Sequence, residues 1–169
     1  MKLTQLLSLA IVLTFSSAST FSRTAVHAAP QHSELNHAAQ SHTNMTLNEG
    51  KKWHTDENLR HAMSNIQANV TSALASIHAG KLSSAQYDAL GKEIWEQISF
   101  IVTNCKLDPK ADEQLHLIIT GIADGIDTAN AKTEHEKRVS GIHKIAESLN
   151  NYGKYFEHPN WQTLKLDQY

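Results

Sequence analysis

Four segments of this chain repeat apolar residues at alternating spacings of three and four, and this periodicity constrains the fold more than any other feature. Such spacing places apolar side chains on one side of an α-helix, and that side must be buried against other helices. No segment shows the period of two that is typical of a β-strand, so the chain is predicted to be all-α. The apolar positions are Leu59, Met63, Ile66, Val70, Ala73 and Ile77; Tyr87, Leu90, Ile94, Ile98, Ile101 and Cys105; Ala111, Leu115, Ile118, Ile119, Ile122 and Ile126; and Val139, Ile142, Ile145, Ala146, Leu149, Tyr152 and Phe156.

Each segment begins with a residue that commonly caps a helix, which sets the predicted boundaries. Gln86 and Glu136 stand three residues after two of these caps, as a capping box requires, and Pro109 follows a third. Gly121 and Gly125 lie four apart and indicate a close contact between helices. Short connections between the helices predict an antiparallel up-down-up-down four-helix bundle over residues 51–157, with residues 158–169 as a tail. The capping residues are Thr55, Ser83, Asp108 and Thr133.

The first 28 residues have the pattern of a secretory signal peptide. Lys2 supplies a positive start, and the apolar run that follows is much shorter than the ~20 residues of a membrane-spanning helix. Cleavage is expected after Ala28, with Ala18 as the other candidate. No later segment is apolar enough to cross a membrane, so the mature chain is predicted to be exported into a bacterial periplasm.

Residues 29–50 are rich in small and polar residues without apolar periodicity, and they are predicted to form a flexible linker. Histidines recur there at a spacing of five, which matches no helix face. A mobile tail of this kind can hold Cu(II), Ni(II) or Zn(II) weakly, or it can be a solvated linker without a role. The histidines of this repeat are His27, His32, His37 and His42.

Several function classes are disfavoured by composition and motifs. The net charge is −2 and both signs are mixed along the chain, whereas a nucleic-acid-binding protein would show a basic stripe. No Ser, His and Asp spacing suggests a catalytic triad, and no glycine-rich loop follows a strand. The absence of a C-x-x-C-H sequence excludes covalent haem. The chain is therefore predicted not to be an enzyme.

The chain has one cysteine, Cys105, and an exported lone thiol has no disulfide partner in its own chain. It is a buried inert side chain, an intermolecular bridge or a soft-metal ligand. The bundle topology brings Cys105 to the same end as Met63, His54, His116 and His158. Thiolate, thioether and imidazole together suit Cu(I). The sequence thus suggests a copper-binding carrier, buffer or sensor.

The same residues also have plain structural interpretations. Met63 lies on an apolar stripe and can simply be a core side chain. His116, at the same level along the bundle axis, can be a hydrogen-bonded surface histidine. Asp112 precedes His116 by one helical turn and can orient its ring. Cys105 lies nearer the rim than Met63 and His116, so a shared metal requires a bent or offset second helix.

Two alternatives remain open. The chain can be a ligand-free interaction module whose aromatic end, including Trp161, docks a periplasmic or membrane protein. Trp161 can also fold back as a plug on the bundle. A b-type haem between Met63 and His116 is the third interpretation, although the isoleucine-rich stripes leave little room for it.

Several short motifs gather at this end of the bundle. They are Trp53-His54-Thr55-Asp56, Leu59-Arg60 with Met63, Asn104-Cys105-Lys106-Leu107 with Pro109, Ala111-Asp112, Leu115-His116, Tyr152-Gly153 with Phe156, and His158-Pro159 with Trp161. Together they resemble a family of small exported helical-bundle proteins of Gram-negative bacteria that are labelled DnrO-like, over about residues 49–161. The resemblance implies an exported bundle in a setting of copper and heavy-metal resistance, without a particular activity, and it draws attention to Arg60, Cys105, Asp112, His116, His158 and Trp161.

Overall fold

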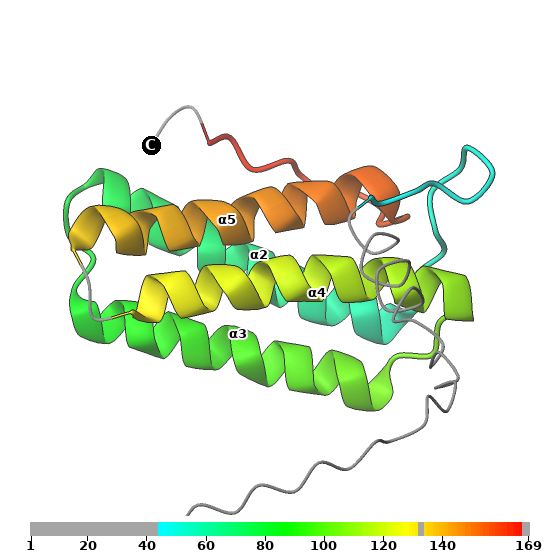
Figure 1. Cartoon of the computed structure of the whole chain (residues 1–169), viewed down its shortest axis with the longest axis horizontal. Coiled ribbons are helices and arrows are strands. Elements are labelled where there is room, and N and C mark those ends of the chain that lie inside the picture. The colour runs from blue at the N-terminus through cyan, green and yellow to red at the C-terminus, as the bar shows by residue number, and fades with distance from the viewer. Residues whose placement is uncertain (1–43, 132–133, 167–169) are drawn as a thin grey trace, which may run out of the picture. The chain divides into compact units, whose positions relative to one another are not determined.

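Four α-helices make up the core of the computed structural model, which describes residues 44–131 and 134–166. Each helix packs against the next one along the chain, and the last also packs against the first, so the four close into a bundle (Figure 1). This arrangement confirms the predicted all-α antiparallel four-helix bundle. The helices are α2 (Glu57–His78), α3 (Ser84–Asn104), α4 (Pro109–Asn130) and α5 (His135–Tyr155).

The predicted apolar stripes form the core almost without exception. Only Ile77, Ile119 and Val139 of the predicted apolar side chains, besides Cys105, are half-buried. Small residues of the helices are buried as well, because close helix packing leaves little room beside the isoleucines. The fully buried large side chains are Tyr87, Tyr152, Phe156, Leu59, Met63, Ile66, Leu74, Ile94, Leu115, Ile118, Ile122 and Ile126.

The helix starts agree with the predicted caps at two of four positions. Ser83 and Gln86 form the predicted capping box, and the Asp108 carboxylate accepts a hydrogen bond from the Lys110 amide at 2.9 Å. The cap of α2 is Asp56 and not Thr55, because the Asp56 carboxylate accepts from the Leu59 amide at 2.7 Å. The predicted cap Thr133 lies outside the described residues, and α5 begins after Glu134.

Helices α4 and α5 make the most extensive contact of the bundle, and two glycines allow it. A Cβ added to Gly125 would lie 2.9 Å from the Gly141 carbonyl oxygen, and one added to Gly141 would lie 2.6 Å from the Gly125 carbonyl oxygen. The two backbones therefore touch directly, as the glycine spacing on α4 predicted. Gly121, one turn earlier, faces only the side chain of Ser148.

The segments that enter and leave the bundle pair with each other. The Trp53 amide donates to the Tyr155 carbonyl and the Glu157 amide donates to the Trp53 carbonyl, both at 2.8 Å, so Trp53 and Phe156 form a parallel bridge. Apart from this bridge, the described part of the chain contains one more isolated β-bridge and no strand. The tail then turns back along α5 (Figure 1).

Within the described ranges, no helix has the length and apolarity that crossing a membrane requires. The predicted signal peptide and the histidine repeat lie outside these ranges. The end of the predicted linker is included, and it contacts the bundle: the Thr46 amide donates to Gln114 at 2.8 Å, and Met45 packs against the core.

Candidate functional site

The start of α2 and the end of α3 meet at the bundle end that the sequence singled out, and Asp56 joins them. While one of its carboxylate oxygens caps α2, the other accepts a hydrogen bond from the Lys106 amide at 2.6 Å. The Asn58 amide group donates to the Asn104 carbonyl at 3.0 Å. These bonds fix the backbone on both sides of Cys105.

Cys105 is the C-terminal cap of α3 and its side chain is half-buried against the core. Burial raises the pKa of its thiol to about 12, with help from the neighbouring Asp56 carboxylate, which repels a thiolate and accepts a hydrogen bond from the thiol. The Asp112 carboxylate adds to the repulsion. The thiol is therefore protonated at neutral pH, which makes it a weak nucleophile and a poor ligand until it loses its proton.

Met63 and His116 occupy different environments. Met63 is fully buried, whereas His116 exposes 68% of its side chain. The His116 Nδ1 lies 2.9 Å from the Asp112 carbonyl oxygen and 3.5 Å from its carboxylate, one helical turn away. A metal or a haem held by both Met63 and His116 would require the core to open around Met63.

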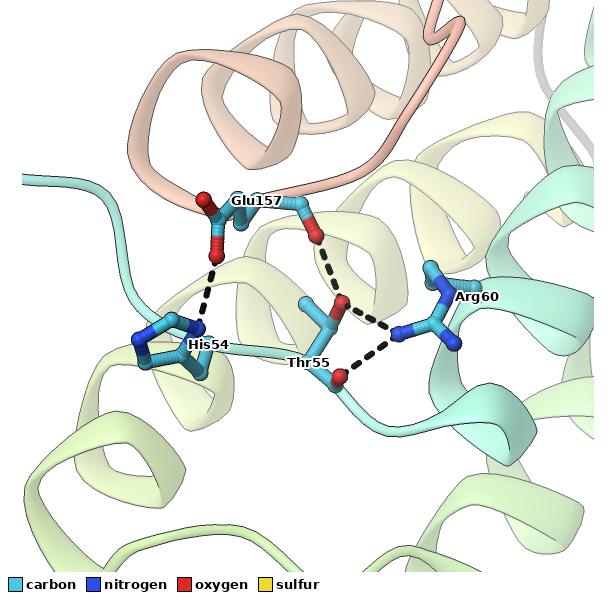
Figure 2. A network of polar contacts seen from close by, with 4 residues as sticks. All are labelled: His54, Thr55, Arg60 and Glu157. Carbon is cyan, nitrogen blue, oxygen red and sulfur yellow. Dashed lines mark hydrogen bonds and ion pairs between the residues drawn. The ribbon is translucent and has the colours of Figure 1, made fainter.

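His54 takes part in a network that ties the start of α2 to the end of α5 (Figure 2). Its Nδ1 lies 2.6 Å from the Glu157 carboxylate, and the Thr55 hydroxyl donates to the Glu157 carbonyl at 2.5 Å. Arg60 donates to the carbonyl and hydroxyl oxygens of Thr55 at 2.6 and 3.1 Å. Because His54 exposes 89% of its side chain, its ion pair contributes little to stability, while Arg60 and Thr55 fix the chain.

His158 lies over the buried hydroxyl of Tyr152. Its Nδ1 is 3.0 Å from the Tyr152 hydroxyl, and its Nε2 is 3.3 Å from the Ser64 hydroxyl. Burial lowers the pKa of His158, and the positive charge of Arg60 lowers it further. Burial also raises the pKa of Tyr152, so the pair is neutral at neutral pH. A neutral, hydrogen-bonded imidazole of this kind connects the tail to the bundle.

Trp161 folds back onto the bundle end. Its ring centroid lies 4.8 Å from those of Tyr152 and His158, and its edge rests on Gly153. The indole Nε1 is buried without a hydrogen-bond partner among the described residues. The aromatic end is thus largely packed against itself, as a plug would be.

A pocket of about 320 Å³ lies beside the Cys105 loop, between the segment before α2 and the start of α4. His54, Asp56 and Asp108 contribute polar groups to it, and Trp53 and Leu107 contribute apolar surface. Across residues 44–131 and 134–166, no group of three or more His, Cys, Asp or Glu side chains is arranged to hold a metal ion. The predicted ligands are therefore present at one end without forming a preorganised metal site.

The opposite end of the bundle carries a buried charge that the sequence analysis missed. Arg138 is only 7% exposed and donates through Nε to the Ala129 carbonyl at 2.7 Å. Its Nη2 donates to the Asp88 carboxylate at 2.7 Å and to the Ser84 carbonyl at 3.3 Å, and its guanidinium stacks 4.7 Å above the Tyr87 ring. A signal was available, because Arg138 precedes Ile142 by four residues and so continues the α5 stripe.

Large apolar side chains remain exposed mainly on α3. Trp95 is 42% exposed, Phe100 37% and Val102 71%, and the only other exposed large apolar side chain in the described ranges is Leu47. Trp95 and Val102 are seven residues apart and lie on the same side of α3. Phe100 lies on the other side, against the His61 ring at 6.4 Å. We call Trp95 and Val102, which share one side of α3, the α3 surface.

Comparisons with protein-family models, with curated proteins and with solved structures found no match to this chain. The resemblance to DnrO-like proteins stays a prediction from the sequence.

Proposed function

We propose that this chain is a non-catalytic helical interaction module, exported to the periplasm, that docks a protein partner through the α3 surface. The observation that carries the proposal is the pair of exposed apolar side chains, Trp95 and Val102, on one side of α3. Exposed apolar residues scattered singly are ordinary, whereas apolar side chains that share one exposed helix side and include an aromatic ring are typical of protein-binding surfaces. A protonated Cys105 and histidines held in structural contacts support a non-catalytic role.

The α3 surface replaces the aromatic end as the docking region. Trp161 was the predicted anchor, but its ring is packed on Tyr152 and Gly153 and offers little free area. Trp95 keeps a large part of its ring in solvent beside exposed Val102. Tryptophan is enriched among residues that dominate binding energy, because one ring buries a large area in a partner pocket.

A photocrosslinking amino acid at Ser99, an exposed position between Trp95 and Val102, tests this proposal in cells. We expect one discrete adduct with a protein partner. The Trp95→Ala change should reduce the adduct roughly tenfold or more, as expected for a central aromatic anchor. The matched control is Leu47→Ala, which removes an equally exposed apolar side chain away from α3. No adduct, or equal loss in both variants, would contradict the proposal.

Soft-metal binding, with copper as the first candidate, is our second proposal. The specific observation in its favour is a half-exposed Cys105 thiol next to Asp56, with His54 and Asp108 lining the adjoining pocket. Binding would require the thiol to lose its proton and His54 to leave Glu157. The protein would then act as a carrier or buffer with a site that forms on binding.

Elemental analysis of the protein from copper-fed cells tests this second proposal. It predicts stoichiometric copper that is lost in Cys105→Ala and retained in His116→Ala, because His116 does not line the pocket beside Cys105. Since one proton must leave a thiol of raised pKa, apparent affinity should rise about tenfold per pH unit around neutrality. Equal copper in the parent and in Cys105→Ala would remove the proposal.

A further inference from the structure

The C-terminal segment, residues 158–166, turns at Pro159 and Asn160 and then runs against α2 and α5. Asn150 bonds both backbone groups of Leu164, donating to its carbonyl at 2.9 Å and accepting from its amide at 2.8 Å. Gln67 donates to the Gln162 carbonyl at 2.5 Å. These bonds come from side chains of the bundle and reach the backbone of the segment, so they hold an extended peptide as a neighbouring strand would.

The side chains of the segment divide into an inner and an outer set. Trp161, Leu164 and Leu166 are half-buried against the core, whereas Gln162 and Lys165 are exposed. The Trp161 ring fits where α5 has a glycine, because a Cβ on Gly153 would overlap the indole. The bundle thus offers side chains that bond a peptide backbone, and a glycine position that accommodates an aromatic ring.

The segment is connected to the bundle through a single turn. Pro159 precedes Asn160, whose φ of +63° lies in the left-handed region, and the Trp161 amide donates to the His158 carbonyl at 3.2 Å. The outer edge is open, since a cavity of about 690 Å³ remains between α2 and residues 162–165. The segment can therefore leave without opening the bundle core.

We propose that the face of α2 and α5 under the C-terminal segment is a docking site for an extended peptide, and that the segment of a second copy occupies it by reciprocal exchange. The contacts that Trp161, Gln162 and Leu164 make with α2 and α5 are with the bundle, so the segment of a second copy can reproduce them. The contacts within the segment, such as that of the Trp161 amide with the His158 carbonyl, lie at the turn. Only the turn at Pro159 and Asn160 differs between the two forms. An extended hinge would release Asn160 from the left-handed region, and this favours the exchanged dimer.

Two complementary defects test the exchange in the full-length chain. Gly153→Leu blocks the aromatic contact but leaves the segment intact, whereas Trp161→Ala with Leu164→Ser weakens the segment but leaves the docking face intact. By light scattering, we expect each variant alone to be monomeric and an equimolar mixture to form a heterodimer. A mixture without heterodimer would overturn the proposal.

The hinge offers a second test that leaves the docking face unchanged. Asn160→Val disfavours a positive φ and should raise the dimer fraction of concentrated protein roughly tenfold relative to Asn160→Gly, which accepts that conformation. Circular dichroism checks that both variants keep the parent helix content. Equal dimer fractions in the two hinge variants would count against exchange through this turn.

Discussion

Gly141→Ala is expected to destabilise the bundle by roughly 2–3 kcal/mol, because the added methyl would meet only backbone. Its Cβ would lie 2.6 Å from the Gly125 carbonyl oxygen and 2.8 Å from the Ala129 Cα, and neither can rotate away. The two helices would have to separate along their most extensive contact. Replacing a helical glycine by alanine normally stabilises a protein by about 1 kcal/mol. A loss of stability in this variant would therefore report the clash of the added methyl with the α4 backbone. Chemical unfolding monitored by circular dichroism measures the change in free energy.

Gly121→Ala is the matched control on the partner helix. Its Cβ would meet only the Ser148 side chain, whose hydroxyl can adopt another rotamer. We expect this variant to be as stable as the parent or slightly more stable. If Gly141→Ala were as stable as Gly121→Ala, the direct contact of the α4 and α5 backbones would be wrong.

Arg138→Met is the second change with a large expected effect, a destabilisation of roughly 3 kcal/mol. Methionine fills a similar volume but leaves the carbonyl oxygens of Ala129 and Ser84 without their charged donor. Because these carbonyls belong to different helices, the loss should loosen the end where α3, α4 and α5 meet. Thermal and denaturant unfolding report the loss, and hydrogen exchange at residues 127–131 reports its location.

Two further variants separate the parts of the Arg138 site. Asp88→Asn should cost less than about 1 kcal/mol, because Asp88 exposes 65% of its side chain and exposed ion pairs contribute little. Arg138→Lys should lose most of the stabilisation, since an ammonium cannot reproduce the planar fork that bonds several oxygens at once. A larger effect for Asp88→Asn than for Arg138→Met would show that the ion pair, and not the carbonyl contacts, holds this end.

The fold could be predicted from sequence because every helix carries its own periodic stripe and its own end signals. Ile94 and Ile98 on α3, for example, are assigned to the core by spacing alone, and the structure buries both. Thr55 was misassigned because two adjacent residues, Thr55 and Asp56, can each cap a helix. The choice depends on the Glu157 carbonyl, which engages the Thr55 hydroxyl and is distant in sequence.

The candidate site was predictable only as a location. The topology places Cys105 and Asp112 at the same end of the bundle. The solvent exposure of each side chain depends on its angular position around the helix axis, and the sequence spacing defines this position poorly at the edge of an apolar stripe. Met63 therefore lies inside the core while His116 faces solvent. Arg138 was missed because a charged residue normally marks the boundary of an apolar stripe. A buried guanidinium can nevertheless donate its hydrogen bonds to carbonyl oxygens at helix ends.

The bridge between Trp53 and Phe156 has a mechanical consequence. In a parallel pair, the chain before Trp53 and the chain after Glu157 leave from opposite ends of the paired stretch. Tension applied between these two segments would load both 2.8 Å hydrogen bonds in shear, at the same time and before any helix is stretched. The helices are thus shielded from pulling forces by two backbone bonds at the end of α5.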